Sequence, residues 1–210
     1  MVNILIADDH AIVREGLKQI IKDDPQMVVS GEAGTGPEAL DLLSKGTYDI
    51  VILDVSMPGP SGLEVLKQIK ARWPELPVMM LSMYPEEQYA IRALKSGASG
   101  YLTKENAPDE LVAAIRKAAR GGKYISSSLA EKLAFNLETT TKKAPHEKLS
   151  DREYEVMCMI ARGKTSTEIA EELNLSVKTI STYRSRILEK LGMENNSEII
   201  RYAIKNHLVD

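Results

Sequence analysis

The chain has 210 residues, of which 43% are hydrophobic and 27% charged, a balance that suits one large or two small globular domains. A formal net charge of -3 excludes nucleic-acid binding through bulk positive charge, so such binding needs a local basic patch. The single cysteine, Cys158, excludes an internal disulfide, and neither a transmembrane run nor a signal peptide is visible, so a cytoplasmic protein with no membrane partner is expected.

The N-terminal part alternates between two kinds of segment. Apolar runs typical of buried strands lie at residues 3–7, 27–30, 48–53, 77–81 and 99–102. Apolar residues recur with helical period at residues 11–22, 37–45, 61–72, 85–96 and 108–120. In the first helix, one inward face is predicted to hold Ile12, Val13, Leu17, Ile20 and Ile21. Strict alternation of this kind predicts an α/β domain with a parallel sheet covered by helices on both faces.

Polar residues follow four of these strands. Asp8 and Asp9 follow the first, Asp54 the third, Ser82 the fourth, and Lys104 the fifth. A flavodoxin-like five-stranded sheet of order 2-1-3-4-5 has its switch point between the first and third strands, where ligands bind beyond the carboxyl ends. We therefore expect these side chains to converge on one site.

The chemistry of this set indicates phosphoryl transfer. Clustered carboxylates repel one another and favour a hard cation such as Mg²⁺, which takes oxygen ligands. An aspartate beside Mg²⁺ can attack a phosphoryl group, while Ser82 and Lys104 can bind its oxygens. The structural alternative is a capped sheet edge with a Lys–Asp ion pair. His10 follows the acidic pair, but imidazole matches a hard cation poorly, so it is left out of the predicted ligands.

The character of the chain changes after residue 120. Gly121 and Gly122 end the last helix of the first part, residues 126–137 predict a short helix, and residues 138–146 are polar and predict a flexible linker.

The C-terminal part is predicted to be all helical. Ser150 with Glu153, and Thr165 with Glu168, stand at capping-box spacing and mark two helix starts. A short turn at Asn174 leads into a helix over 176–192, which predicts a helix-turn-helix unit. Its inward residues are predicted to be Val177, Ile180, Ile187, Leu188 and Leu191. A last helix is expected over 196–206.

The outward face of the 176–192 helix combines basic residues with small hydroxyls. Such a face can reach phosphates and base edges in the major groove of DNA. The candidate DNA-contact residues are Lys178, Thr179, Ser181, Thr182, Arg184 and Ser185. The alternative is an ordinary solvated helix face.

The motifs ADDH at 7–10, LDVSMPGPSG at 53–62, LSM at 81–83 and GYLTK at 100–104 resemble the receiver domain of two-component response regulators. The resemblance implies that Asp54 is the phosphoacceptor and that Ser82 and Tyr101 are a switch pair, with Lys104 on the phosphate. It further implies a Mg²⁺ site whose ligands are Asp8, Asp9, Asp54 and the backbone carbonyl of Ser56.

The stretch LSDREYEVMCMIARGKTSTEIAEELNLSVKTISTYRSRILEKLGM is similar to LuxR-type DNA-binding domains, so the whole chain resembles the NarL/FixJ family. This implies a receiver at 1–122, a linker with a short helix at 123–146 and a helix-turn-helix domain at 147–210. The implied partners are a cognate histidine kinase, double-stranded promoter DNA and a second copy of the chain on activation, with RNA polymerase as a further candidate. The last helix is the implied dimer surface on DNA, while the receiver face around the helices at 85–96 and 108–120, or the first helix, either dimerises or frees the DNA helix.

The predicted function is therefore a phosphorylation-dependent transcription regulator and not an enzyme. Two alternatives belong to other classes. An aspartyl-phosphate enzyme needs an acid/base carboxylate two residues after the nucleophile, where this chain has Ser56. A phosphate-independent DNA-binding protein would have no use for the intact acidic pocket.

Overall fold

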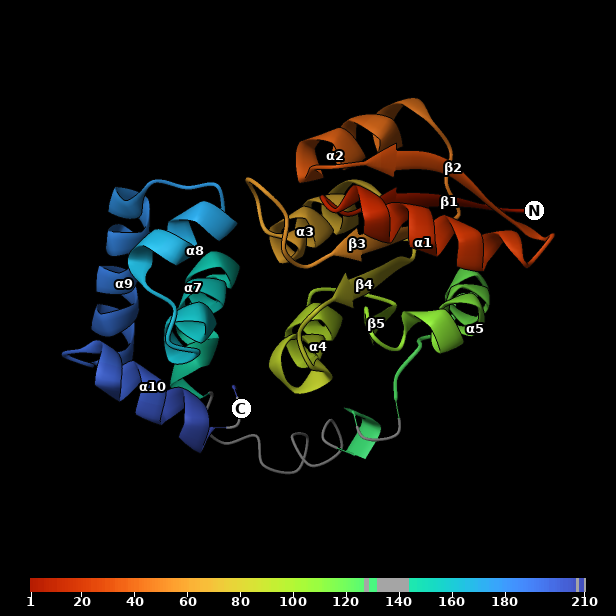
Figure 1. Cartoon of the computed structure of the whole chain (residues 1–210). Helices are drawn as coiled ribbons and strands as arrows, with labels where there is room; N and C mark the ends of the chain where they lie inside the picture. The colour runs from red at the N-terminus through yellow and green to blue at the C-terminus, as the bar shows by residue number, and fades with distance from the viewer. Residues whose placement is uncertain (127–128, 132–143, 207, 210) are drawn as a thin grey trace. The chain divides into compact units, whose positions relative to one another are not determined.

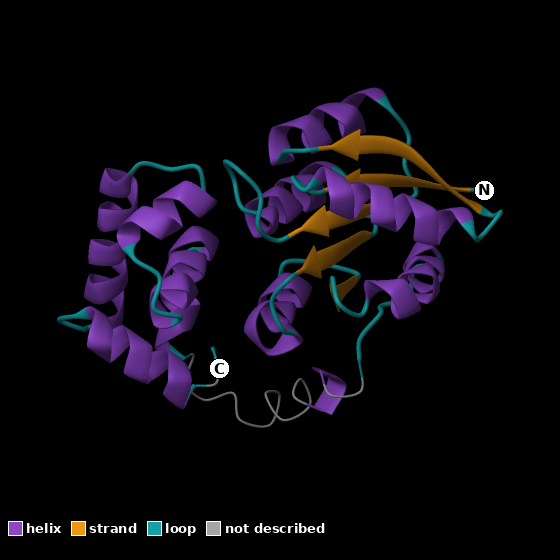
Figure 2. Ribbon diagram, in the orientation of Figure 1, coloured by secondary structure: helices purple, strands orange, loops and turns teal. Residues whose placement is uncertain are grey.

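The computed structural model describes residues 1–126, 129–131, 144–206 and 208–209 (Figure 1). The chain divides into two compact units, Met1–Glu131 and Lys132–Asp210, and among the described residues strands occur only in the first (Figure 2). In the part of the chain that is described, no helix is both long enough and apolar enough to cross a membrane.

The first unit is built on a five-stranded parallel sheet of order β2-β1-β3-β4-β5, which confirms the predicted topology. The strands are β1 (Val2–Ala7), β2 (Met27–Ala33), β3 (Ile50–Asp54), β4 (Val78–Ser82) and β5 (Gly100–Thr103). β3 and β4 are buried along their whole length, as their apolar sequences predict. β2 continues past its predicted end at residue 30, because this edge strand is only partly buried and its polar residues hide the strand from an apolar-run criterion.

Helices cover both faces of the sheet. They are α1 (Ala11–Lys22), α2 (Gly36–Lys45), α3 (Gly62–Arg72), α4 (Glu86–Lys95) and α5 (Ala107–Ala119). α1 and α5 lie together on one face, where Leu17 and Leu111 pack against Ile4 and Ile50, and α2 and α3 are neighbours on the other (Figure 1). Burial of these apolar stripes is the main force that closes the helices onto the sheet.

One residue of the predicted inward face of α1 is placed differently. Ile12 is 83% exposed, whereas Leu17 and Ile21 are buried as predicted. Ile12 lies about 100° around the helix from Val13, off the stripe that repeats at helical spacing. The predicted inward position of Ile12 rested on its apolar character alone and is wrong.

Residues that follow α5 still belong to the first compact unit, which runs to Glu131. Tyr124 forms a parallel bridge with Gly100, its N–H donates to the Ser99 carbonyl, and its hydroxyl donates to Glu110. Leu129 is buried. The helix predicted over 126–137 has its residues 129–131 in helical conformation, while 132–137 and most of the predicted linker lie outside the described residues.

The described residues of the second unit form a short 3₁₀ turn, Pro145–Lys148, and four α-helices: α7 (Asp151–Ala161), α8 (Ser166–Glu172), α9 (Val177–Leu191) and α10 (Asn196–Lys205). Both predicted capping boxes are present, at Ser150–Glu153 and at Thr165–Glu168. Asn174 has a positive φ of 51°, which lets the chain reverse tightly between α8 and α9. α9 packs on α7 and α8, with Ile180 and Ile187 buried, and Cys158 is buried as well.

Val177 is an exception on α9. It was predicted to face inward but is 45% exposed at the first position of the helix. Helical periodicity assigns a residue an angle around the axis and not a depth along it, so it cannot tell whether a terminal turn is covered.

Candidate functional site: an acidic pocket and a helix-turn-helix face

The sheet register brings the acidic residues together. β1 and β3 are paired in parallel with Ala7 opposite Leu53, so Asp8 and Asp54 leave the same edge side by side. Both side chains are buried, at 1% and 2% exposure, whereas Asp9 is partly exposed. The predicted convergence of these three residues is thus what the structure contains.

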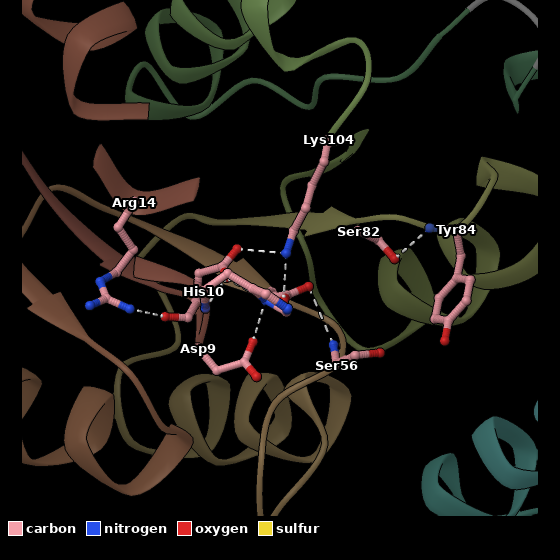
Figure 3. A network of polar contacts seen from close by, with 9 residues as sticks. Asp9, His10, Arg14, Ser56, Ser82, Tyr84 and Lys104 are labelled. Carbon is pink, nitrogen blue, oxygen red and sulfur yellow. Dashed lines mark hydrogen bonds and ion pairs between the residues drawn. The ribbon is translucent and has the colours of Figure 1, made fainter. Parts of the chain in front are cut away.

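Lys104 reaches the pocket from the end of β5. Its Nζ lies 2.8 Å from Asp54 Oδ2 and 2.7 Å from Asp8 Oδ2, and dashed lines in Figure 3 mark both ion pairs from the labelled Lys104. Burial by itself lowers the pKa of this ammonium, but Asp54 and Asp8 outweigh burial and raise it. Lys104 is therefore a permanent positive charge at the base of the site.

Asp54 is left short of compensating charge. Burial raises its pKa to about 7, with the charge of Asp8 adding to the rise and the Lys104 ammonium opposing it. Its Oδ1 accepts a hydrogen bond from the Ser56 N–H at 3.3 Å. One ammonium does not balance the carboxylates gathered here, so the pocket favours a further cation.

The donor set fits a hard divalent ion. Ligand atoms of Asp8, Asp9, His10 and Asp54 all lie within 4.8 Å of one another. The buried Oδ2 of Asp8, although close to Lys104, accepts no hydrogen bond of regular geometry. Carboxylate oxygens are the ligands that Mg²⁺ prefers, so the residues present suit the predicted ion.

His10 and Arg14 were not part of the predicted site. The ring Nδ1 of His10 lies 2.8 Å from Asp9 Oδ1, and the backbone N–H of His10 donates to Asp8 Oδ1. Arg14, one turn into α1, donates from Nη1 to the Asp8 carbonyl at 2.6 Å (Figure 3). The only sequence signal for Arg14 was a basic residue near the start of the helix that follows the acidic pair. Its role depends on a backbone atom that a sequence pattern does not reveal.

Glycine is required where the chain turns behind Asp54. A Cβ on Gly62, the first residue of α3, would lie 1.9 Å from the Asp54 carbonyl oxygen. The Gly62 N–H donates to the Val55 carbonyl, which closes the loop after β3. The last glycine of the LDVSMPGPSG motif thus lets α3 begin directly against the strand that carries Asp54.

Ser82 and Tyr101 occupy the β4–β5 side of the pocket. Ser82 is buried and its Oγ accepts a hydrogen bond from the Tyr84 N–H at 3.1 Å (Figure 3). Tyr101 is fully buried, and its hydroxyl donates to the Tyr84 carbonyl at 2.9 Å. Burial raises the pKa of the Tyr101 hydroxyl, so it remains protonated and able to donate. Tyr84 therefore connects the two residues predicted as a switch pair.

The candidate DNA face of α9 is mostly exposed. Lys178, Ser181, Thr182 and Ser185 lie on the open side of the helix, and Thr179 is half-buried. The Thr182 hydroxyl donates to the Lys178 carbonyl, and the Ser185 hydroxyl to the Ser181 carbonyl. Their oxygens therefore keep accepting capacity on the outer face. Arg184 differs from its predicted outward position: it is half-buried and bonded to α10.

The two units match two family models. Residues 4–116 match the response regulator receiver domain, and residues 147–203 match the bacterial regulatory proteins of the luxR family. A receiver joined to a LuxR-type helix-turn-helix domain defines the class of DNA-binding response regulators.

Two curated relatives align with the chain over nearly their whole length. The chain is 37% identical over 209 residues to the response regulator UvrY of Escherichia coli K12, covering 99% of this chain and 96% of UvrY. It is 38% identical over 215 residues to the oxygen regulatory protein NreC of Staphylococcus carnosus, covering 99% of both.

Solved structures of RcsB are similar to this chain over nearly its whole length. RcsB of Salmonella typhimurium superposes with a TM-score of 0.69 at 29% identity, covering 98% of each chain. RcsB bound to promoter rprA in the presence of phosphomimetic BeF₃⁻ gives a TM-score of 0.63 at 31% identity, covering 96% of this chain and 97% of that one. The chain belongs to the NarL/FixJ family of two-component response regulators, which are DNA-binding transcription regulators.

Proposed function

We propose that this chain accepts a phosphoryl group on Asp54 from a cognate histidine kinase and thereby gains affinity for promoter DNA. The observation that carries the proposal is the convergence of Asp8, Asp9 and Asp54 at one edge of the sheet, with the Lys104 ammonium paired to Asp8 and Asp54. A structural ion pair at a sheet edge does not need three carboxylates for one lysine. A pocket that binds a cation and a phosphoryl group does.

The transfer step follows from the position of Asp54. A carboxylate oxygen of Asp54 attacks the phosphorus of a phosphohistidine; the new O–P bond forms as the N–P bond breaks, and the released imidazole takes a proton from water. Bound Mg²⁺ would neutralise charge on the phosphoryl oxygens, held by Asp8, Asp9, Asp54 and the Ser56 carbonyl. Lys104 moves from its pairing with Asp54 to the incoming phosphoryl oxygen.

Ser82 transmits the change at Asp54 to the segment around Tyr84. Its hydroxyl now accepts from the Tyr84 N–H, and a phosphoryl oxygen on Asp54 offers a stronger, charged acceptor for the hydroxyl proton. Rotation of Ser82 toward Asp54 releases Tyr84, whose carbonyl holds Tyr101. In this way the added charge biases a two-state segment at the ends of β4 and β5.

The output is binding of double-stranded promoter DNA through α9 by a phosphorylation-induced homodimer, with RNA polymerase as a further partner in the cytoplasm. Exposed apolar side chains support a dimer, since Ile12 on α1 and Ile204 on α10 are 83% and 52% exposed. Two linked copies would bind two half-sites about one helical turn of DNA apart, which raises affinity through effective concentration.

The test compares the full chain with and without beryllofluoride and Mg²⁺. Affinity for a duplex selected from a random library should rise on addition of beryllofluoride, and sedimentation should report dimers at the same protein concentration. An unchanged affinity would refute phosphorylation control. A monomer that nevertheless gains affinity would refute the dimer and leave control through exposure of α9.

A further inference from the structure

Arg184 is held in place by an uncharged group. Its Nε donates to Asn196 Oδ1 at 2.6 Å, a contact that joins the middle of α9 to the first residue of α10. A guanidinium has five N–H donors in a fixed plane. With Nε engaged, the edge that carries the two terminal nitrogens remains available for a bidentate contact to a phosphate or carboxylate.

The neutrality of the partner distinguishes Arg184 from other arginines of the described residues. Three of them are held by carboxylates, Arg14 by Glu32, Arg116 by Asp24 and Arg152 by Glu155. A carboxylate fixes an arginine and cancels its charge, whereas an amide fixes it and leaves the charge intact. Among the described residues Arg184 forms no ion pair, so its full charge is available to a ligand.

The place of Arg184 on α9 indicates which part of DNA it meets. It lies about 60° around the helix from Ser181, at the border of the exposed face and on the side of α10. The centre of that face carries the short hydroxyl side chains that allow close approach to base edges. A long, half-buried arginine at the border is suited to the sugar-phosphate backbone that flanks the groove.

We propose that Asn196 is a positioning residue for DNA binding, which holds Arg184 so that its terminal nitrogens bind a DNA phosphate. This inference rests on the proposed role of α9. It assigns to the start of α10 a function separate from dimerisation. A pre-positioned guanidinium loses less side-chain freedom when it binds a phosphate. For that reason the hydrogen bond between Arg184 and Asn196 raises the affinity for DNA.

Two substitutions separate geometry from charge. Asn196→Ala removes the hydrogen bond to Arg184 and keeps the charge of Arg184. It leaves the N-cap of α10 intact, because the neighbouring Asn195 supplies the side chain that accepts from the Glu198 N–H. Asn196→Asp keeps an oxygen at the same place and adds a carboxylate, which is favourable in the first turn of a helix. The charged variant should therefore fold at least as stably as the wild type and bind DNA worse.

The experiment measures affinity of the full chain, with beryllofluoride and Mg²⁺, for a duplex selected from a random library by the wild-type chain. Asn196→Ala should weaken binding about fivefold and Asn196→Asp about twentyfold, with the melting temperature unchanged or higher in the second. Ser197→Asp adds the same charge to the same exposed turn without touching Arg184, and it should cost far less than Asn196→Asp. In an Arg184→Ala background, Asn196→Ala should not weaken binding further, and Asn196→Asp should cost no more than Ser197→Asp.

Each outcome decides between the proposal and a structural role. Three outcomes would overturn the proposal. The first is a loss from Asn196→Ala that persists in the Arg184→Ala background, and the second is an Asn196→Asp variant that binds like the wild type or no worse than Ser197→Asp. The third is a loss of binding that follows a fall in melting temperature. Lys178→Ala separates this from failure of the proposed function. If it weakens binding and Arg184→Ala does not, α9 reads DNA and the inference about Asn196 is wrong; if neither variant matters, the role of α9 is wrong.

Discussion

The hydroxyl of Tyr101 donates a hydrogen bond to the backbone carbonyl of Tyr84 at 2.9 Å. Ser82 accepts from the N–H of the same residue, so both members of the predicted switch pair are tied to one peptide segment. Tyr101→Phe removes the first tie and leaves the aromatic ring in place. We expect the Tyr84 segment to open more readily, with faster amide exchange at Met83, Tyr84 and Glu86. Phosphoryl labelling should stay near the wild-type rate, because the Tyr101 hydroxyl donates to the Tyr84 carbonyl and is not a ligand of the acidic pocket.

Asp54 is the predicted nucleophile. Asp54→Asn should abolish labelling by a small phosphodonor in Mg²⁺, because an amide cannot form the acyl phosphate. Asp9→Asn should weaken Mg²⁺ binding, since it removes one negative ligand. Asp41→Asn, on the exposed surface of α2, is the matched control and should label normally. Undiminished labelling of Asp54→Asn, measured by phosphate-affinity electrophoresis, would remove Asp54 from this role.

Binding of α9 to DNA should be sensitive to its exposed lysine. Lys178→Ala should weaken binding to specific and random duplexes alike, and reduce the slope of log affinity against log salt by about 1 if the lost contact is to a phosphate. Lys205→Ala, at the far end of α10, provides a charge-matched control. Equal affinities for all three chains across a salt series would remove Lys178 from the DNA contact.

Gly62 should be intolerant of a side chain. Gly62→Ala places a methyl group against the Asp54 carbonyl, which backbone movement must relieve at a cost of more than about 2 kcal/mol in free energy of unfolding. Gly16→Ala in the middle of α1 meets no atom within 4 Å and should stabilise the chain by about 0.5–1 kcal/mol through helix propensity. Urea unfolding of both variants tests the pair, and a Gly62→Ala chain as stable as the wild type would contradict the close contact.

Glu153 should contribute stability that depends on pH. Burial by itself raises its pKa, but hydrogen bonds from Lys190 and Ser150 outweigh burial and hold the pKa below its ordinary value. A carboxyl with a lowered pKa stabilises the fold above the pKa it has in the unfolded chain, and this stabilisation disappears as pH falls through the folded value. Glu153→Gln keeps the acceptor of the capping box and loses the charge.

Calorimetry of the full chain therefore has a predicted sign. At pH 7 the Glu153→Gln variant should be less stable, because it loses the ion pair with Lys190. The loss should be only about 1 kcal/mol, since Lys190 is partly exposed and solvent screens the pair. The difference from the wild type should shrink as the pH falls below 4. A difference that stays constant from pH 3 to pH 7 would assign the loss to packing instead of charge.

The sequence by itself determined the order of the elements and the members of the acidic pocket. Alternating apolar runs predict the strands and helices, and in a parallel sheet all carboxyl ends meet at one edge, so the placement of Asp8, Asp54 and Lys104 follows from topology. The helix starts could also be predicted from the sequence, because a capping residue and its partner lie only three positions apart, as at Ser150 and Glu153.

Only the tertiary structure decided which contacts individual side chains make across elements. Arg14 binds the Asp8 carbonyl, and Arg184 turns from the outer face of α9 toward Asn196. Ile12 is exposed although its helix is amphipathic. Periodicity fixes the angle of a residue around its own helix, whereas these outcomes depend on which neighbouring element comes within hydrogen-bonding distance or covers a turn. That information exists only once the elements are packed.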